Sequence, residues 1–135
     1  MQPRAIICDD ESHIRSMLKL TLKSMGVEVV GEARTAGEAE ILFQREMPDM
    51  VLLDINMPGR SGDDALGNII RDFPSAFVIM LTSVADMETV QRCLQKGAAN
   101  YILKDTPIAG IKEIIKETWV DFNRNRGSGH GGREV

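Results

Sequence analysis

The sequence predicts a doubly wound α/β fold, in which a parallel β-sheet carries helices on both faces. Two observations favour this fold. Five short apolar runs recur along the chain, and most are continuous, as is typical of strands covered on both faces. Segments with three- and four-residue apolar spacing separate them, which indicates amphipathic helices. The predicted strands cover residues 5–8, 27–30, 50–53, 77–81 and 101–103.

Residues that commonly start and stop helices stand between these runs. The expected starts are Ser12, Thr35 with Glu38 as a capping box, Ser61, and Thr106 followed by Pro107 at the first helical position. The expected stops are Gly26 and Gly97. Strand and helix alternate through five repeats, so we expect a five-stranded parallel sheet of the flavodoxin-like kind, with five helices and right-handed crossovers.

The length of 135 residues allows one domain. Apolar residues make up 43% and charged residues 27%, a composition typical of a soluble globular protein with a real core. After Asn123 the apolar periodicity stops. We therefore expect a domain over residues 1–124 and a flexible polar tail over residues 125–135.

Composition also weighs against several classes of protein. The chain has no apolar run of roughly 18 residues and no signal-peptide layout at its start, so we expect a cytoplasmic protein without membrane contact. Its two cysteines, Cys8 and Cys93, show no paired spacing and are expected to be buried apolar side chains. A net charge of −4, and too few residues after the last helix for a helix-turn-helix, weigh against direct nucleic acid binding. A protein partner or a small ligand is expected instead.

Polar side chains follow four of the five predicted strands at the point where each strand ends. In a doubly wound sheet the ligand crevice lies outside the carboxyl ends of the strands. The residues at these ends are Asp9, Asp10 and Glu11 after the first strand, Asp54 after the third, Thr82 and Ser83 after the fourth, and Lys104 and Asp105 after the fifth.

Carboxylates brought together at one sheet edge repel each other and require a positive partner. Mg²⁺ is the natural one, because it prefers oxygen ligands and binds one or two carboxylates together with a phosphate. A carboxylate beside Mg²⁺, a lysine and a threonine hydroxyl suits phosphoryl transfer, in which Asp54 would attack in line to give an aspartyl phosphate. Taken singly, each residue has a structural alternative: acids at a helix start, a turn residue, a satisfied hydroxyl or a solvated lysine. Their joint position favours the chemistry.

The residues at these strand ends resemble the receiver domains of two-component response regulators, over residues 4–123. The resemblance rests on DDE at 9–11, LLDINMPG at 52–59 with Gly62, LTS at 81–83, and GA at 97–98 leading into YILK at 101–104. Order, spacing and neighbouring residue types agree with the family pattern. The family's sheet has the strand order 2-1-3-4-5.

The resemblance implies a role for each residue of the acidic cluster. Asp54 would accept a phosphoryl group from a phosphohistidine of a sensor histidine kinase or a phosphotransfer protein. Asp10, Asp54 and the main-chain carbonyl of Asn56 would bind Mg²⁺ or Mn²⁺, and Asp9 would act mainly through a bound water. Apart from its own phosphotransfer and dephosphorylation, the domain would be a signalling phosphoacceptor and not an enzyme.

The resemblance also implies a switch. Thr82 and Lys104 would contact the phosphoryl oxygens, and Tyr101 would turn inward as Thr82 moves. The output surface would be the fourth helix, fifth strand and fifth helix, at about residues 86–122. It would serve a downstream protein or an effector domain missing from this chain, with a homodimer through the fourth and fifth helices as a further expectation.

Two positions depart from the family pattern. Asp105 follows Lys104 where many receivers carry a proline after a cis bond, so a trans bond or a rare strained cis bond is expected. Ser83 stands where the family usually carries alanine or glycine, with Val84 beyond it, which leaves the lifetime of the aspartyl phosphate open.

Two other functions fit less well. A phosphohydrolase of the haloacid dehalogenase type also uses an aspartate and Mg²⁺, but its Asp-x-Asp follows the first strand and a cap domain would not fit this length. A nucleotide- or flavin-binding module would need a glycine-rich loop where this chain has acids. The sequence leaves open whether the chain is free-standing or part of a longer regulator.

Overall fold

A computed structural model of the chain describes residues 2–83 and 87–130, with side chains described up to residue 125. Its strands are β1 (Arg4–Cys8), β2 (Glu28–Ala33), β3 (Met50–Asp54), β4 (Val78–Thr82) and β5 (Asn100–Leu103). Its helices are α1 (Ser12–Ser24), α2 (Ala36–Glu46), α3 (Gly62–Asp72), α4 (Met87–Lys96) and α5 (Ile108–His130). Strand and helix alternate throughout, as predicted.

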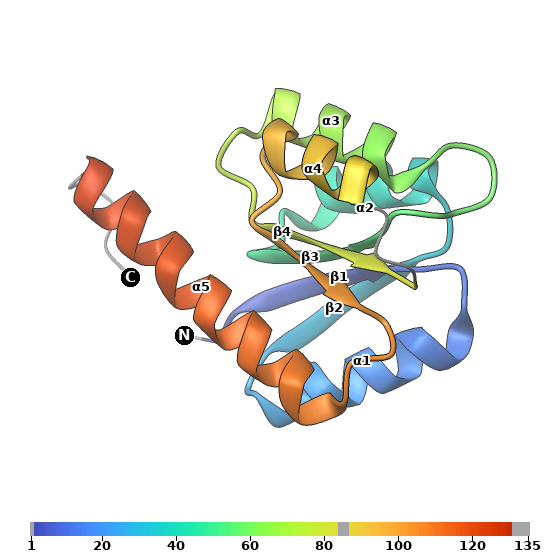
Figure 1. Ribbon diagram of the computed structural model, residues 1–135, viewed down its shortest axis with the longest axis horizontal. Helices are drawn as coiled ribbons and strands as arrows, with labels where there is room; N and C mark the ends of the chain where they lie inside the picture. The colour runs from blue at the N-terminus through green and yellow to red at the C-terminus, as the bar shows by residue number, and fades with distance from the viewer. Residues whose placement is uncertain (1, 84–86, 131–135) are drawn as a thin grey trace.

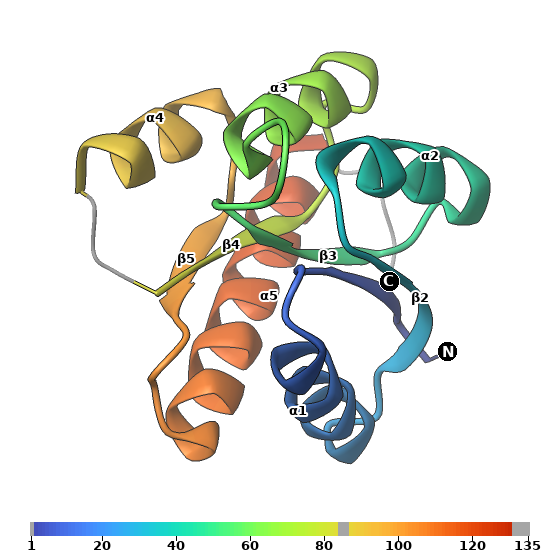
Figure 2. The ribbon, with the colours of Figure 1, turned by 90° about the vertical axis from the view of Figure 1, so that its right-hand side faces the viewer.

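The five strands form one parallel sheet in the order β2-β1-β3-β4-β5, which confirms the predicted topology. Helices α2, α3 and α4 lie on one face, and α1 and α5 lie on the other (Figures 1 and 2). The edge strand β2 extends three residues beyond the predicted run, to Ala33, because Gly31 and Glu32 continue the pairing with β1. This strand is only partly buried, so its polar residues do not interrupt it.

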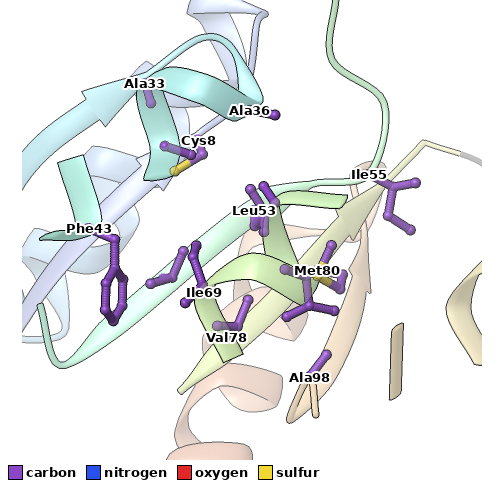
Figure 3. Close-up of a cluster of buried hydrophobic side chains, with 14 of the residues drawn as sticks. Cys8, Ala33, Ala36, Phe43, Leu53, Ile55, Ile69, Val78, Met80 and Ala98 are labelled. Atoms are coloured by element: carbon purple, nitrogen blue, oxygen red, sulfur yellow. The ribbon is translucent and has the colours of Figure 1, made fainter. Parts of the chain in front are cut away.

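Side chains that alternate along each strand fill two separate cores. In β3, for example, Val51 and Leu53 pack under α2, α3 and α4, whereas Met50 and Leu52 pack against α1 and α5. Figure 3 shows the first of these cores. Every position of such a strand is buried, which is why the apolar runs are continuous. Cys8 and Cys93 are free and buried, as expected.

The helix ends follow the predicted caps in part. The side chains of Thr35 and Ser61 accept hydrogen bonds from the main-chain N–H groups of Glu38 and Asp64 at 3.1 and 3.3 Å, as N-caps do. Gly26 and Gly97 end their helices at φ 80° and 120°, where a residue without Cβ is favoured. The predicted start of the first helix at Ser12 is confirmed, although Glu11 occupies the N-cap position and makes no side-chain cap.

The C-terminal helix is longer than the sequence predicted. α5 continues through residues 125–130 as regular helix, although these residues were expected to begin a flexible tail. Helical hydrogen bonds propagate at one per residue once a helix exists, without needing an apolar stripe. Figure 1 shows the C-terminal part of α5 projecting beyond the sheet. Residues 131–135 lie outside the described residues, and the domain boundary at residue 124 stays a prediction.

Candidate phosphoacceptor site

The strand register brings the predicted site residues to one edge of the sheet. Cys8 on β1 pairs with Leu53 on β3, so Asp9 and Asp54 follow at the same level of neighbouring strands. Asp54 in turn pairs with Leu81, so Thr82 stands one residue further out on β4. Chain order reverses between β1 and β3, the place where doubly wound sheets bind their ligands.

The three predicted metal carboxylates lie together. Asp9, Asp10 and Asp54 each offer an oxygen atom, and these atoms all lie within 4.8 Å of one another. Asp9 and Asp54 are buried, whereas Asp10 is exposed. Main-chain N–H groups hold the buried carboxylates in place: Glu11 donates to Asp9 Oδ1 at 2.8 Å and Asn56 donates to Asp54 Oδ1 at 3.1 Å.

Lys104 reaches into this cluster from the end of β5. Its Nζ lies 2.8 Å from Asp9 Oδ2, 3.0 Å from Asp54 Oδ2 and 3.0 Å from Glu11 Oε1, and its side chain is only 9% exposed. Burial disfavours the ammonium, but its contacts with Asp9, Asp54 and Glu11 outweigh that effect and raise the pKa of Lys104 above its ordinary value. The lysine therefore stays charged.

One ammonium does not compensate the carboxylates fully. Burial, and then the neighbouring charge of Asp9, raise the pKa of Asp54 from 3.8 to about 6, even though Lys104 and the Asn56 N–H act in the opposite direction. The outer oxygens Asp9 Oδ2 and Asp54 Oδ2 are buried and, among the described residues, receive no hydrogen bond, although Lys104 lies at ion-pair distance. Buried carboxylate oxygens without a donor are suitable ligands for a cation.

The donor set therefore fits Mg²⁺ or Mn²⁺. All candidate ligands are oxygen atoms, which these ions prefer. Residues Asp9, Asp10 and Asp54 would hold the ion. A divalent ion there would favour the ionised form of Asp54, whose pKa is raised by burial and by the charge of Asp9.

Gly62 holds the loop after β3 against the site. A Cβ on Gly62 would lie 1.9 Å from the main-chain oxygen of Asp54, so no other residue fits without displacing the backbone. Its N–H also donates to the carbonyl oxygen of Ile55 at 2.7 Å. The glycine therefore fixes the chain immediately after the proposed phosphoacceptor.

The remaining predicted residues lie on β4 and β5. Thr82 is buried, and its carbonyl accepts a hydrogen bond from the N–H of Lys104 at 2.8 Å. Tyr101 is half-buried and packs at the border of the core beneath α3 and α4. Ser83 is exposed, the Lys104–Asp105 bond is trans, and Val84 lies outside the described residues.

Two sets of contacts were not predicted from the sequence. Glu11 was assigned to the acidic cluster or to a helix start, and its bond to Lys104 was not foreseen. The second set joins α3 to α4, where the buried Asp63 binds Lys96 at 2.8 Å and Arg92 at 3.3 Å. Burial alone would raise the pKa of Asp63, but the two cations lower it. No local motif marks a pair of residues about 30 positions apart.

Comparisons with known proteins agree with this geometry. The family model described as "Response regulator receiver domain" matches residues 5–116. The chain is 35% identical to the chemotaxis protein CheY of Thermotoga maritima over 87% of its own length and 98% of that protein. It is 40% identical to the uncharacterized transcriptional regulatory protein YhcZ of Bacillus subtilis, but spans only 52% of it.

Solved structures give the same result. A CheY-like receiver domain protein from Methanospirillum hungatei superposes with a TM-score of 0.84 at 30% identity, over 93% of this chain and 99% of that one. CheY of Borrelia burgdorferi, solved in a complex with CheX, BeF₃ and Mg, gives a TM-score of 0.82 at 29% identity, over 86% and 88% of the two chains.

The chain belongs to the response regulator receiver domain family. It is thus a signalling domain of two-component systems, and the haloacid dehalogenase alternative finds no support. Within the described residues, no helix combines the length and apolar character needed to cross a bilayer.

Proposed function

We propose that Asp54 is the phosphoacceptor and receives its phosphoryl group from a phosphohistidine of a sensor kinase or phosphotransfer protein. The main support is the position of its side chain, which is 2% exposed and lies 3.0 Å from the Lys104 ammonium, which also contacts the carboxylate of Asp9. The N–H of Asn56 holds Oδ1, whereas Oδ2 receives no hydrogen bond among the described residues.

The transfer forms a bond between an Asp54 oxygen and phosphorus, while the bond from phosphorus to the donor nitrogen breaks and its electron pair stays on the imidazole. An ionised carboxylate needs no general base, so the protein contributes position and charge. Lys104 and the Thr82 hydroxyl would bind the phosphoryl oxygens. Mg²⁺ or Mn²⁺ on Asp9, Asp10, Asp54 and the carbonyl of Asn56 would neutralise their charge.

Hydrolysis of the product would restore the carboxylate. Water would attack phosphorus, the bond between Asp54 and phosphorus would break, and the electron pair would return to the carboxylate. Ser83 is exposed beside Thr82 and would influence the access of this water. We propose that the domain catalyses no further reaction.

The signal would leave through α4, β5 and α5. Thr82 on β4 and Tyr101 on β5 belong to adjacent strands, since Thr82 pairs with Leu103 and Met80 pairs with Tyr101. A shift of Thr82 toward the phosphoryl group would make room for Tyr101 and bias a two-state surface. This surface would bind a downstream protein, an effector domain or a second copy of the chain, without direct nucleic acid binding. A cytoplasmic location stays a prediction.

Intact mass spectrometry tests the proposal. The protein is incubated with Mg²⁺ and acetyl phosphate, alongside Asp54→Asn and a sample containing EDTA. Wild type should gain one phosphoryl group, and both controls should gain none. Equal labelling of wild type and Asp54→Asn would overturn the assignment of Asp54. Equal labelling of wild type with and without EDTA would show that phosphorylation does not require a divalent cation.

A further inference from the structure

The Lys104 ammonium has more anionic neighbours than phosphoryl transfer requires. An ammonium offers three N–H donors. Its Nζ lies within 3.0 Å of an oxygen of Asp9, of Asp54 and of Glu11, so these carboxylates surround it. A phosphoryl group on Asp54 can gain the ammonium only if Lys104 gives up or shares one of these contacts.

The three contacts differ in geometry. Glu11 Oε1 accepts a hydrogen bond from Nζ at 3.0 Å. The buried oxygens Asp9 Oδ2 and Asp54 Oδ2 lie as close, yet among the described residues neither receives a hydrogen bond. Lys104 therefore shares its ammonium between Glu11 at the rim of the site and the two buried aspartates.

The three carboxylates also differ in how easily they can leave. The Asp54 side chain is 2% exposed and that of Asp9 is fully buried, so neither can separate from Lys104 without leaving a buried charge. The Glu11 side chain is 46% exposed and can rotate into water.

We propose that Glu11 is a positioning residue that competes with the phosphoryl oxygens for Lys104 and thereby weakens binding of the phosphoryl group at Asp54. The inference rests on the proposed role of Asp54. Glu11 would set how readily the domain reaches the phosphorylated state without touching the reacting atoms. The Glu11 carboxylate bonds to Lys104, which lies 93 positions away in the sequence. Because this bond is exposed, it can break at a small cost in free energy.

The test uses Glu11→Gln, which keeps the shape of the side chain but removes its charge. The substitution should fold, because Glu11 contributes to α1 through its main-chain carbonyl, which accepts from Ile14 and Arg15, and not through a side-chain cap. Asp105→Asn is the matched control. It removes an equal charge from an exposed carboxylate next to Lys104 in the chain. Among the described residues, this carboxylate forms no ion pair with Lys104.

Beryllium fluoride serves as the probe, because it is an anionic analogue of the phosphoryl group. Full-length proteins are titrated at saturating Mg²⁺, and binding is followed by the amide NMR signals of Thr82 and Lys104. Glu11→Gln should bind about two- to fivefold more tightly than wild type, the range expected for one partly exposed ion pair, with a much smaller change for Asp105→Asn. Glu11→Gln should also be labelled by acetyl phosphate faster than wild type, and Asp105→Asn should change this rate much less.

Equal affinities of Glu11→Gln and wild type, or an equal gain for Asp105→Asn, would overturn the competition, since the latter result would indicate only a general effect of charge. A different result would contradict the proposed function of Asp54, namely that wild type binds no beryllium fluoride. If wild type and Glu11→Gln bind it equally and Asp54→Asn does not bind, the phosphoacceptor stands and the role of Glu11 falls.

Discussion

The raised pKa of Asp54 predicts that the ionised Asp54 carboxylate destabilises the metal-free protein. The carboxyl titrates at about 6 in the folded chain instead of 3.8, because burial and the charge of Asp9 disfavour its ionised form. A group with a raised folded-state pKa favours folding at low pH, and this contribution is lost as the pH rises from the unfolded toward the folded value. Asp54→Asn removes the ionisation and should therefore stabilise the protein above that range.

The size of the effect follows from the shift. A difference of roughly two pKa units corresponds to about 3 kcal/mol at 1.36 kcal/mol per unit. The stabilisation by Asp54→Asn should approach this value at about pH 7.5, and should fall to about 1 kcal/mol at about pH 4.5. The side chain is almost fully buried, so screening by solvent reduces this value little.

Urea unfolding followed by circular dichroism measures this difference. Wild type, Asp54→Asn and the control Asp105→Asn are compared in EDTA at both pH values. In saturating Mg²⁺ the gap should narrow, because an ion bound only by the folded wild type stabilises it by mass action. Equal stability of wild type and Asp54→Asn at both pH values in EDTA would refute the reasoning, as would an equal gain for Asp105→Asn.

Three further predictions concern the surroundings of the site. Gly62→Ala should cost about 1–3 kcal/mol of stability and weaken Mg²⁺ binding, because its Cβ would lie 1.9 Å from the Asp54 carbonyl oxygen. The control is Gly67→Ala, whose Cβ meets nothing closer than 3.8 Å. Equal urea midpoints for the two variants would contradict the clash at Gly62. Asp63→Asn should lower the local stability of α4 by about 1–3 kcal/mol and speed its hydrogen exchange, since two cations of α4 bind this carboxylate. Unchanged hydrogen exchange in α4 peptides would refute the prediction. Mg²⁺ should raise the thermal midpoint of wild type more than that of Asp10→Asn, and EDTA should reverse the rise; an equal rise in both would exclude Asp10 as a ligand.

The sequence alone determined the architecture and the composition of the site. Burial on both faces requires nearly every strand residue to be apolar, so the runs at 50–53 and 77–81 identified central strands directly. Parallel strands place all their carboxyl ends at one edge, so the sequence predicts that Asp54 and Lys104 lie near each other. Both inferences rest on periodicity and chain direction, which are local properties of the sequence.

Which charged side chains meet depends on the three-dimensional packing of the elements. The bond between Lys104 and Glu11 joins residues 93 positions apart, and the contacts of Asp63 with α4 cross about 30 positions. Such pairs depend on side-chain rotamers and on the relative placement of separate elements, and neither leaves a local pattern. The spacing of apolar residues therefore predicts the fold. The charge environment of Asp54 depends instead on three carboxylates that share one lysine.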